Sequence, residues 1–176
     1  NQSEGLKHNA VSSFLEINGN QLWVGSDGGG ITIWDREKNT YKYHQHDKEN
    51  PKSLGSNAVL DIAQISDSSI WVTTWAGGLN QYDPETNGFR KYLHNPDDPQ
   101  SIANNHVFGL QEDKNGDLWM GVFHGGVCRL DRKTGRFTTI PVDPNNENAL
   151  TSDIIFGLTI DSKGDIWVPT VTGLNK

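Results

Sequence analysis

The stretch GDLWMGVFHGG, residues 116–126, reads as a β-strand of alternating side chains that ends in a pair of glycines. Nearly the same string occurs three more times along the chain. Its tryptophan belongs to one column of an internal repeat with a constant spacing of 48 residues, formed by Trp23, Trp71, Trp119 and Trp167. A constant period of this length is typical of proteins that are built from repeated structural units.

Each copy of the repeat contains four short apolar stretches that are separated by turn sequences. The turn signals in the third copy are KNGD at 114–117 and RKTG at 132–135. Four antiparallel strands in a unit of this length are typical of a β-propeller blade. The strands expected in the third copy are 107–113, 117–122, 126–131 and 136–142.

We therefore predict an all-β fold, a β-propeller segment of four-stranded antiparallel blades. The tryptophan of each blade should fill the space between adjacent sheets, because its large flat side chain buries about 150–250 Å². The expected blades are residues 6–53, 54–101 and 102–149, with a truncated fourth blade at 150–176.

The incomplete fourth blade indicates a larger propeller, which we expect to have about seven blades. An isolated segment would leave a sheet face exposed at each end and a strand edge unpaired, and such surfaces invite association. The expected partners are therefore the rest of a parent propeller or another copy of the chain. In isolation the 176 residues should self-associate.

Composition excludes several classes of partner. The formal charge of −7 argues against nucleic acid and anionic membrane surfaces. The chain has no apolar run of about 18 residues, so we expect this segment to make no membrane contact. Cys128 is the single cysteine, which excludes an internal disulfide.

Carboxylates recur in positions that resemble a calcium loop, in DKNGD at 113–117 and DSKGD at 161–165. Both strings fall where a hairpin turn recurs, and they lack the distal glutamate of a full calcium loop. Aspartates also end the third strand of each blade, where a carboxylate commonly accepts backbone N–H bonds within a turn; they are Asp35, Asp83 and Asp131. We interpret both sets as turn residues.

The six histidines show no ligand spacing, and no nucleophile elbow or phosphate-binding loop is present. We therefore predict no metal, no cofactor and no catalytic residue in this segment. Residues that recur in every copy are expected to build the scaffold, whereas a functional residue need occur only once.

The candidate ligand-binding residues lie in columns that vary between copies, in the loop between the second and third strands. This loop should share a face with the long connections between blades. Its unusual members, given that exposed aromatic rings suit stacking on a sugar, are Asp27, Trp75, Phe123 and His124. The alternative is that Trp75 and Phe123 merely pack against a neighbouring blade.

The motifs SL, NxV, GDLWMG, GGVxRLD and TGRF, best seen in 53–89 and 101–137, resemble the two-component regulator propeller repeat. The resemblance covers essentially the whole chain. It implies the periplasmic sensor region of a hybrid two-component histidine kinase of Bacteroides-like gut bacteria, which often responds to oligosaccharides. Any kinase activity would belong to a parent chain and not to these residues.

The resemblance therefore predicts a ligand-sensing or scaffolding segment of a sensor ectodomain, with an oligosaccharide as its ligand and no enzymatic activity of its own. Two other functions remain open. One is an enzyme of the propeller-lyase or propeller-hydrolase kind, and the other is a platform for protein interaction.

Overall fold

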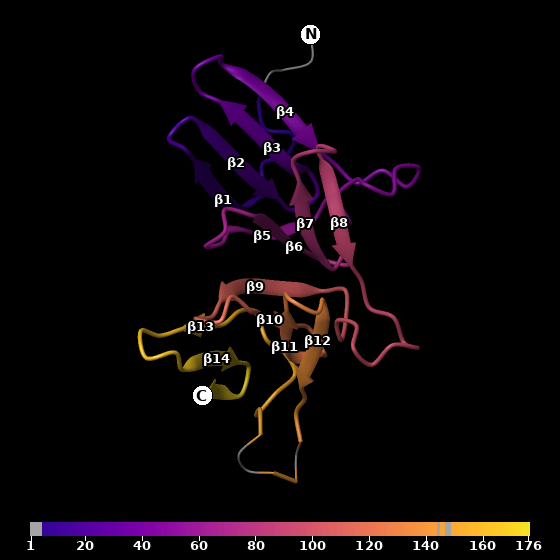
Figure 1. The fold of residues 1–176 in the computed structure, drawn as a ribbon, viewed down its shortest axis with the longest axis vertical. Helices are drawn as coiled ribbons and strands as arrows, with labels where there is room; N and C mark the ends of the chain where they lie inside the picture. The colour runs from indigo at the N-terminus through magenta and orange to yellow at the C-terminus, as the bar shows by residue number, and fades with distance from the viewer. Residues whose placement is uncertain (1–4, 144, 147–148) are drawn as a thin grey trace. The chain divides into compact units, whose positions relative to one another are not determined.

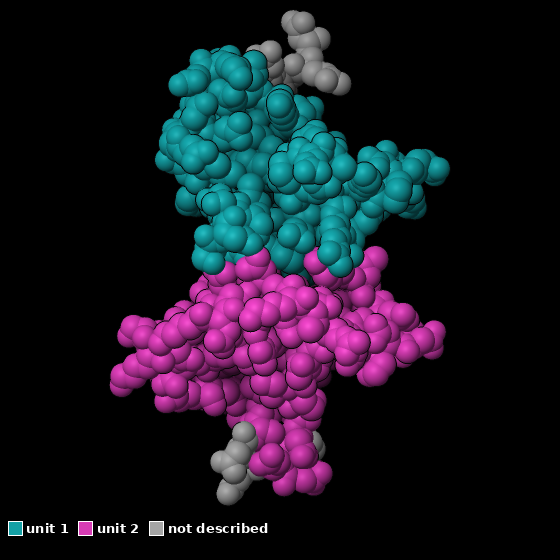
Figure 2. Space-filling view, in the orientation of Figure 1, with its two compact units in different colours: residues 1–91 teal, residues 92–176 magenta. Residues whose placement is uncertain are grey.

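The computed structural model describes residues 5–143, 145–146 and 149–176, and within them it contains strands and turns but no helix. The chain forms two compact units, residues 1–91 and residues 92–176, which are coloured separately in Figure 2. Each unit contains two antiparallel sheets (Figure 1). No helix in the described part of the chain is long and apolar enough to cross a membrane.

The first unit contains two sheets of four strands, each in simple sequential order. The strands of its first sheet are β1 (Val11–Ile17), β2 (Gln21–Ser26), β3 (Gly30–Asp35) and β4 (Thr40–His44). Those of its second sheet are β5 (Val59–Gln64), β6 (Ile70–Thr74), β7 (Leu79–Asp83) and β8 (Gly88–Tyr92), whose last residue falls at the start of the second unit.

The second unit repeats this order with one four-stranded and one three-stranded sheet. The strands of the four-stranded sheet are β9 (Val107–Glu112), β10 (Leu118–Val122), β11 (Gly126–Asp131) and β12 (Arg136–Ile140). Those of the other are β13 (Thr159–Ile160), β14 (Ile166–Thr170) and β15 (Gly173–Asn175). The all-β class and the antiparallel blade are thus confirmed.

The recurring glycine pair begins the third strand of a blade. Its second glycine has a φ of +72° at Gly30, +68° at Gly78 and +73° at Gly126, a region that side chains rarely adopt. A Cβ atom at Gly126 would also lie 2.3 Å from the carbonyl oxygen of Ile140. The turn into the third strand therefore requires glycine for its backbone conformation and for its close packing.

Two of the repeated tryptophans, Trp23 and Trp119, lie between sheets of their own unit, as predicted. Trp23 is 2% exposed and belongs to one apolar cluster with Ile62, which comes from the next sheet of the first unit. In the second unit Trp119 packs against a cluster that contains Leu158. Each first strand also carries one extra residue opposite its neighbour, in a β-bulge that recurs in β1, β5 and β9.

Phe14 departs from the pattern of its column. Its counterparts Ile62, Leu110 and Leu158 are buried, whereas Phe14 is 73% exposed. Ile62 is covered by the sheet that precedes it, but within residues 5–91 no sheet precedes β1. The position of a residue in the repeat thus determines the face of its sheet on which the side chain lies. Whether that side chain is buried depends on a neighbouring sheet that covers this face.

The indole N–H of the repeated tryptophan is held by the hairpin turn that precedes it. Trp119 Nε1 donates to Asp113 Oδ2 at 2.9 Å, and Trp167 Nε1 donates to Asp161 Oδ2 at the same distance. The other oxygen of Asp113 accepts the backbone N–H groups of Asn115 and Asp117. The two carboxylate strings therefore close turns and orient tryptophans, which confirms the turn interpretation.

The electrostatics of Asp113 agree with this role. Burial raises the pKa of the Asp113 carboxyl, but the hydrogen bonds that Trp119, Asp117 and Asn115 donate outweigh burial and hold that pKa below its ordinary value. The carboxylate is therefore ionised at neutral pH, and each of these hydrogen bonds is charge-assisted.

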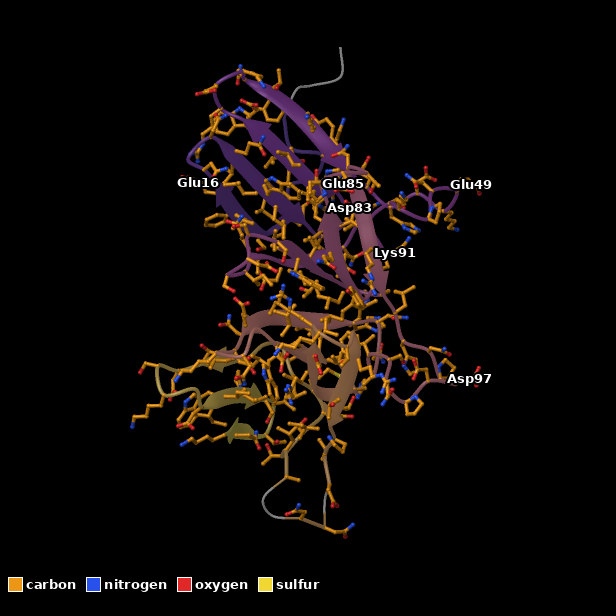
Figure 3. All side chains as sticks on the ribbon, in the orientation of Figure 1. Glu16, Glu49, Asp83, Glu85, Lys91 and Asp97 are labelled. Atoms are coloured by element: carbon orange, nitrogen blue, oxygen red, sulfur yellow. The ribbon has the colours of Figure 1, made fainter. Side chains whose placement is uncertain are left out.

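The aspartates at the ends of the third strands also act within turns, as predicted. Asp83 accepts the backbone N–H of Glu85 and the hydroxyl of Thr86, and Figure 3 shows Asp83 and Glu85 at the same turn. The Thr86 hydroxyl lowers the pKa of the Asp83 carboxyl. Equivalent bonds from backbone N–H groups are accepted by Asp35 and Asp131.

The substitution Asp113→Ala should destabilise the second unit. It leaves the Trp119 N–H without its acceptor and opens the turn, which we expect to lower the free energy of unfolding by about 1–3 kcal/mol. Urea denaturation followed by tryptophan fluorescence measures the change. The Asp113→Asn variant keeps an acceptor oxygen, so its free energy of unfolding should fall less than that of Asp113→Ala. An Asp113→Ala variant as stable as the original chain would contradict this role of Asp113.

An aromatic cluster joins the two sheets of the first unit at His44. The His44 ring lies 5.8 Å from Trp23, 5.5 Å from Tyr82 and 5.2 Å from Phe89 between ring centroids. Its Nε2 is buried without a hydrogen-bond partner. Burial, with a smaller contribution from the nearby charge of Lys42, lowers the pKa of His44 below its ordinary value of 6.5.

Because the folded chain resists protonation of His44, its contribution to stability should depend on pH. The unfolded chain binds the proton near pH 6.5 and the folded chain only at lower pH, so the stabilisation is present above pH 6.5 and is lost as the pH falls. The matched variant is His44→Tyr, which introduces the residue that the next copy has at Tyr92. When urea denaturation at pH 7.5 is compared with pH 5.5, the free energy of unfolding should fall less for His44→Tyr than for the original chain. An equal fall in the variant and the original chain would contradict this role of His44.

Candidate functional site

The loops between second and third strands lie beside the connections between blades, as the sequence predicts. In the first unit, Asp27 forms an isolated β-bridge with Ala58, and the N–H of Trp75 donates to the carbonyl oxygen of the same Ala58. Both side chains are exposed, and the Trp75 side chain retains 39% of its surface. Asp27 and Trp75 thus both pair with Ala58 through their backbones.

Phe123 and His124 occupy the equivalent loop in the second unit. The Phe123 N–H donates to the carbonyl oxygen of His106, which repeats the contact between Trp75 and Ala58 one copy later. The two rings are 4.3 Å apart between centroids. The four predicted residues therefore fall into two pairs, one in each unit, and a single binding face that includes both pairs stays a prediction.

Phe123 belongs to a larger group of rings, which we call the ring site. Phe156 meets Phe108 in a perpendicular contact at 5.4 Å and lies 6.4 Å from Phe123. Phe156 is 58% exposed, so the group presents apolar surface to solvent. The ring site consists of His106, Phe108, Phe123, His124 and Phe156.

A carboxylate lies at the edge of the ring site. His124 Nδ1 is 3.1 Å from Asp153 Oδ2, and the backbone N–H of His124 donates to the carbonyl oxygen of Asp153. Both side chains are about half exposed. When Nδ1 carries the proton it donates to the carboxylate, which leaves Nε2 as a hydrogen-bond acceptor for a bound molecule.

His124 is held in a backbone conformation that disfavours its side chain. Its φ is +52°, and the equivalent residues in the first two copies are Gly28 and Ala76, also with positive φ. A left-handed conformation costs an L-residue about 1–2 kcal/mol. A histidine at a position where glycine suits the backbone better makes His124 a candidate functional residue.

The site has the features of a binding surface for a molecule with both apolar and polar groups. The rings offer flat faces, while His124, Asp153 and the Asn104–His106 pair offer hydrogen bonds at the edge. His106 Nδ1 lies 2.7 Å from Asn104 Oδ1, which fixes the orientation of that ring. Apolar walls with a few oriented polar groups are typical of small-molecule sites.

Four residues of the site were missed by the sequence analysis: His106, Phe108, Asp153 and Phe156. The same test, departure from a repeat column, would have found them. The column of His106 otherwise contains two alanines and an isoleucine, and Phe108 and Phe156 replace Ser12 and Leu60. Asp153 stands where the other copies have asparagine.

Among the residues with described positions, no group of three or more histidine, cysteine or carboxylate side chains could hold a metal ion. Two histidines instead belong to the repeat. The Nδ1 atoms of His46 and His94 lie 2.9 and 2.8 Å from the carbonyl oxygens of Leu54 and Ile102. Their role is thus in the connection between sheets and not simply in a solvated surface.

Sequential four-stranded sheets with tryptophans between them define a segment of a β-propeller. Residues 101–124 match the family described as two component regulator propeller. This part of the chain is therefore similar to a two-component regulator propeller repeat, and the resemblance expected from the sequence is confirmed. The matched residues end at His124, so they contain part of the ring site.

Solved structures with similar folds include two extracellular domains from Bacteroides thetaiotaomicron. The extracellular domain of BT3049, described as a hybrid two component system, shares 26% identity at a TM-score of 0.82, and the match covers 97% of this chain and 23% of that one. The extracellular domain of BT4673 shares 20% identity at a TM-score of 0.52, and the match covers 99% of this chain and 28% of that one. The chain thus spans about a quarter of the length of these relatives.

An enzyme is also among the similar structures. Virginiamycin B lyase from Staphylococcus aureus shares 16% identity at a TM-score of 0.65, over 94% of this chain and 54% of that one. This likeness extends to the fold alone. No curated protein matches the chain.

Replacement of His124 by glycine should leave the fold at least as stable as before. The substitution removes the cost of the left-handed conformation and loses one exposed hydrogen bond, so the free energy of unfolding should stay level or rise by up to about 1 kcal/mol. Urea denaturation measures it. A loss of more than about 1 kcal/mol would show that His124 is a structural residue.

Proposed function

We propose that the chain is a ligand-sensing segment in the periplasmic ectodomain of a hybrid two-component system. The observation that carries this proposal is the similarity to the BT3049 extracellular domain, which extends over 97% of the chain. The family match at residues 101–124 supports it independently. Kinase activity would reside in another part of the parent protein, and the segment itself would bind without catalysis.

The ligand that best fits the ring site is an oligosaccharide. A sugar ring has an apolar face of C–H groups and an edge of hydroxyl groups. The exposed face of Phe156 and the ring of Phe123 suit the first, whereas His124 and Asp153 suit the second. Trp75, exposed on the equivalent loop of the first unit, would provide a separate stacking surface in that unit.

A propeller lyase or hydrolase is the second candidate function, favoured by the hydrogen bond between His124 and Asp153. A histidine that a carboxylate orients can act as a general base. The two functions differ in their products. A sensor releases the oligosaccharide intact, whereas an enzyme cleaves it, a hydrolase with addition of water and a lyase by elimination. Mass spectrometry of the sugar after incubation with the chain separates them.

The parent gene provides a direct test of the sensor proposal. A sensor requires a membrane-spanning helix and a histidine kinase domain in the same reading frame, so that binding outside the membrane can control phosphorylation inside it. We expect the gene to encode both after this segment. A parent protein that lacks both, or that carries a glycosidase domain instead, would contradict the proposal.

Substitution of the exposed rings should weaken oligosaccharide binding without loss of the fold. Loss of an aromatic stacking surface in Trp75→Ala or Phe123→Ala should weaken binding by about 1–3 kcal/mol. Calorimetric titration with a panel of neutral and uronic-acid tetrasaccharides measures the affinities. Trp34, which stacks on Tyr41 away from these loops, provides the matched control in Trp34→Ala.

The control variant should bind as the original chain does. If both Trp75→Ala and Phe123→Ala retained full affinity with an intact fold, the ligand would bind elsewhere. In that case the rings at these loops would serve only to pack against a neighbouring blade.

A further inference from the structure

The hydrogen-bond acceptor of the tryptophan N–H differs between the four copies of the repeat. In the third and fourth copies an aspartate accepts it, and in the second copy Trp71 Nε1 donates to Ser69 Oγ at 2.9 Å. In the first copy Trp23 Nε1 is buried without a hydrogen-bond partner. A buried donor without an acceptor is costly, so such an atom requires an explanation.

The cause lies in the sequence of the first copy. Ile17 stands six residues before Trp23, where Asp113 precedes Trp119, and an isoleucine offers no acceptor. Gln21 stands two residues before Trp23, where Ser69 precedes Trp71, but it does not bond to the indole. Both positions that supply an acceptor elsewhere have thus changed in the same copy.

The same two residues line a cavity of about 640 Å³ that lies entirely within the first unit. Its wall combines rings and amides from both sheets of this unit, and its members include Ile17, Gln21, Trp23, Gln64, Tyr82 and Arg90. The volume falls in the range of ordinary small-molecule sites, about 300–1,000 Å³. Trp23 therefore lines a cavity that a ligand could occupy. Its N–H is covered in the free chain, so a ligand oxygen reaches it only by displacing part of the wall.

The charges of the wall favour an uncharged ligand. Asp67 and Asp83 also line the cavity, but Asp67 accepts bonds from Ser69 and Asp83 closes its own turn. With Arg90 as the cation, the wall has no net positive charge that would attract an anion. The side-chain amides of Gln21 and Gln64 both donate and accept hydrogen bonds, which suits hydroxyl groups.

We propose that this cavity binds a small uncharged compound rich in hydroxyl groups, a sugar or polyol of one or two rings, whose oxygen accepts the Trp23 N–H. The cavity is lined by the turns that join first to second strands, whereas the ring site lies at the other ends of the strands in the second unit. The proposal is independent of sensing at the ring site.

Nuclear magnetic resonance of the ¹⁵N-labelled chain tests the proposal, because each indole N–H gives its own signal. Trp23→Phe identifies the Trp23 signal. The probes are glucose and cellobiose, with glucuronate and glucosamine as charged counterparts. We expect at least one neutral probe to shift the Trp23 signal in a saturable manner while the Trp34 signal stays in place.

The repeat itself provides the variant that should abolish this effect. Gln21→Ser introduces the acceptor that the second copy has at Ser69, so the indole would be satisfied internally. We expect affinity for the neutral probe to fall about tenfold, within the range for one lost hydrogen bond. Ile17→Asp, which introduces the residue of the third copy, should act in the same direction if Gln21→Ser perturbs the fold. Trp34→Ala, at a residue that belongs neither to this cavity nor to the ring site, should bind the probe unchanged.

A Trp23 signal that no probe moves would overturn the proposal and would assign the N–H to an internal partner such as a bound water. A shift with the charged probes alone would overturn the choice of ligand. Either failure leaves sensing at the ring site untouched, because that function is read from Trp75→Ala and Phe123→Ala.

Discussion

The contact on which the whole fold depends is a tryptophan ring held between two sheets. A sheet of four short strands has little core of its own and buries its apolar face only against the next sheet. Trp23 meets this need in the first unit and Trp119 in the second. In the second unit Asp113 and Asp161 accept the indole N–H groups of Trp119 and Trp167, and this links the turn after the first strand to the same contact.

This constraint explains why so much of the chain repeats and where it is free to vary. Glycines at the entrance to the third strand, aspartates at its end and asparagines between blades all serve the sheets and their connections. Asn57, for example, accepts the backbone N–H groups of Gly28 and Gly30 through its carbonyl oxygen and that of His46 through its side chain. At the loop tips these contacts are made by the backbone, so the side chains there can be rings or a histidine without loss of the scaffold.

The repeat predicted the fold because each column reports a position that the sheets require in every copy. It predicted the role of Asp83 for the same reason. Phe123 and His124 are candidates for the opposite reason, because their columns vary between copies. The repeat did not predict the ring site as a whole, since Phe108 and Phe156 lie on first-strand columns, and only the folded chain shows that they meet Phe123. The exposure of Phe14 likewise depends on which neighbouring sheet it meets, which no column records. The missing acceptor of the Trp23 N–H, by contrast, follows from Ile17 and Gln21 in its own copy.

The central claim is that repeated residues build the scaffold and that departures from the repeat carry binding. Hydrogen exchange of the whole chain, with and without the tetrasaccharide that it binds most tightly, tests this claim most directly. The account predicts slower exchange at the backbone amides of residues 106–108, 123–124 and 153–156 in the complex, with little change at the hairpin turns 113–117 and 161–165. Protection confined to those turns, with the ring-site loops unaffected, would contradict it.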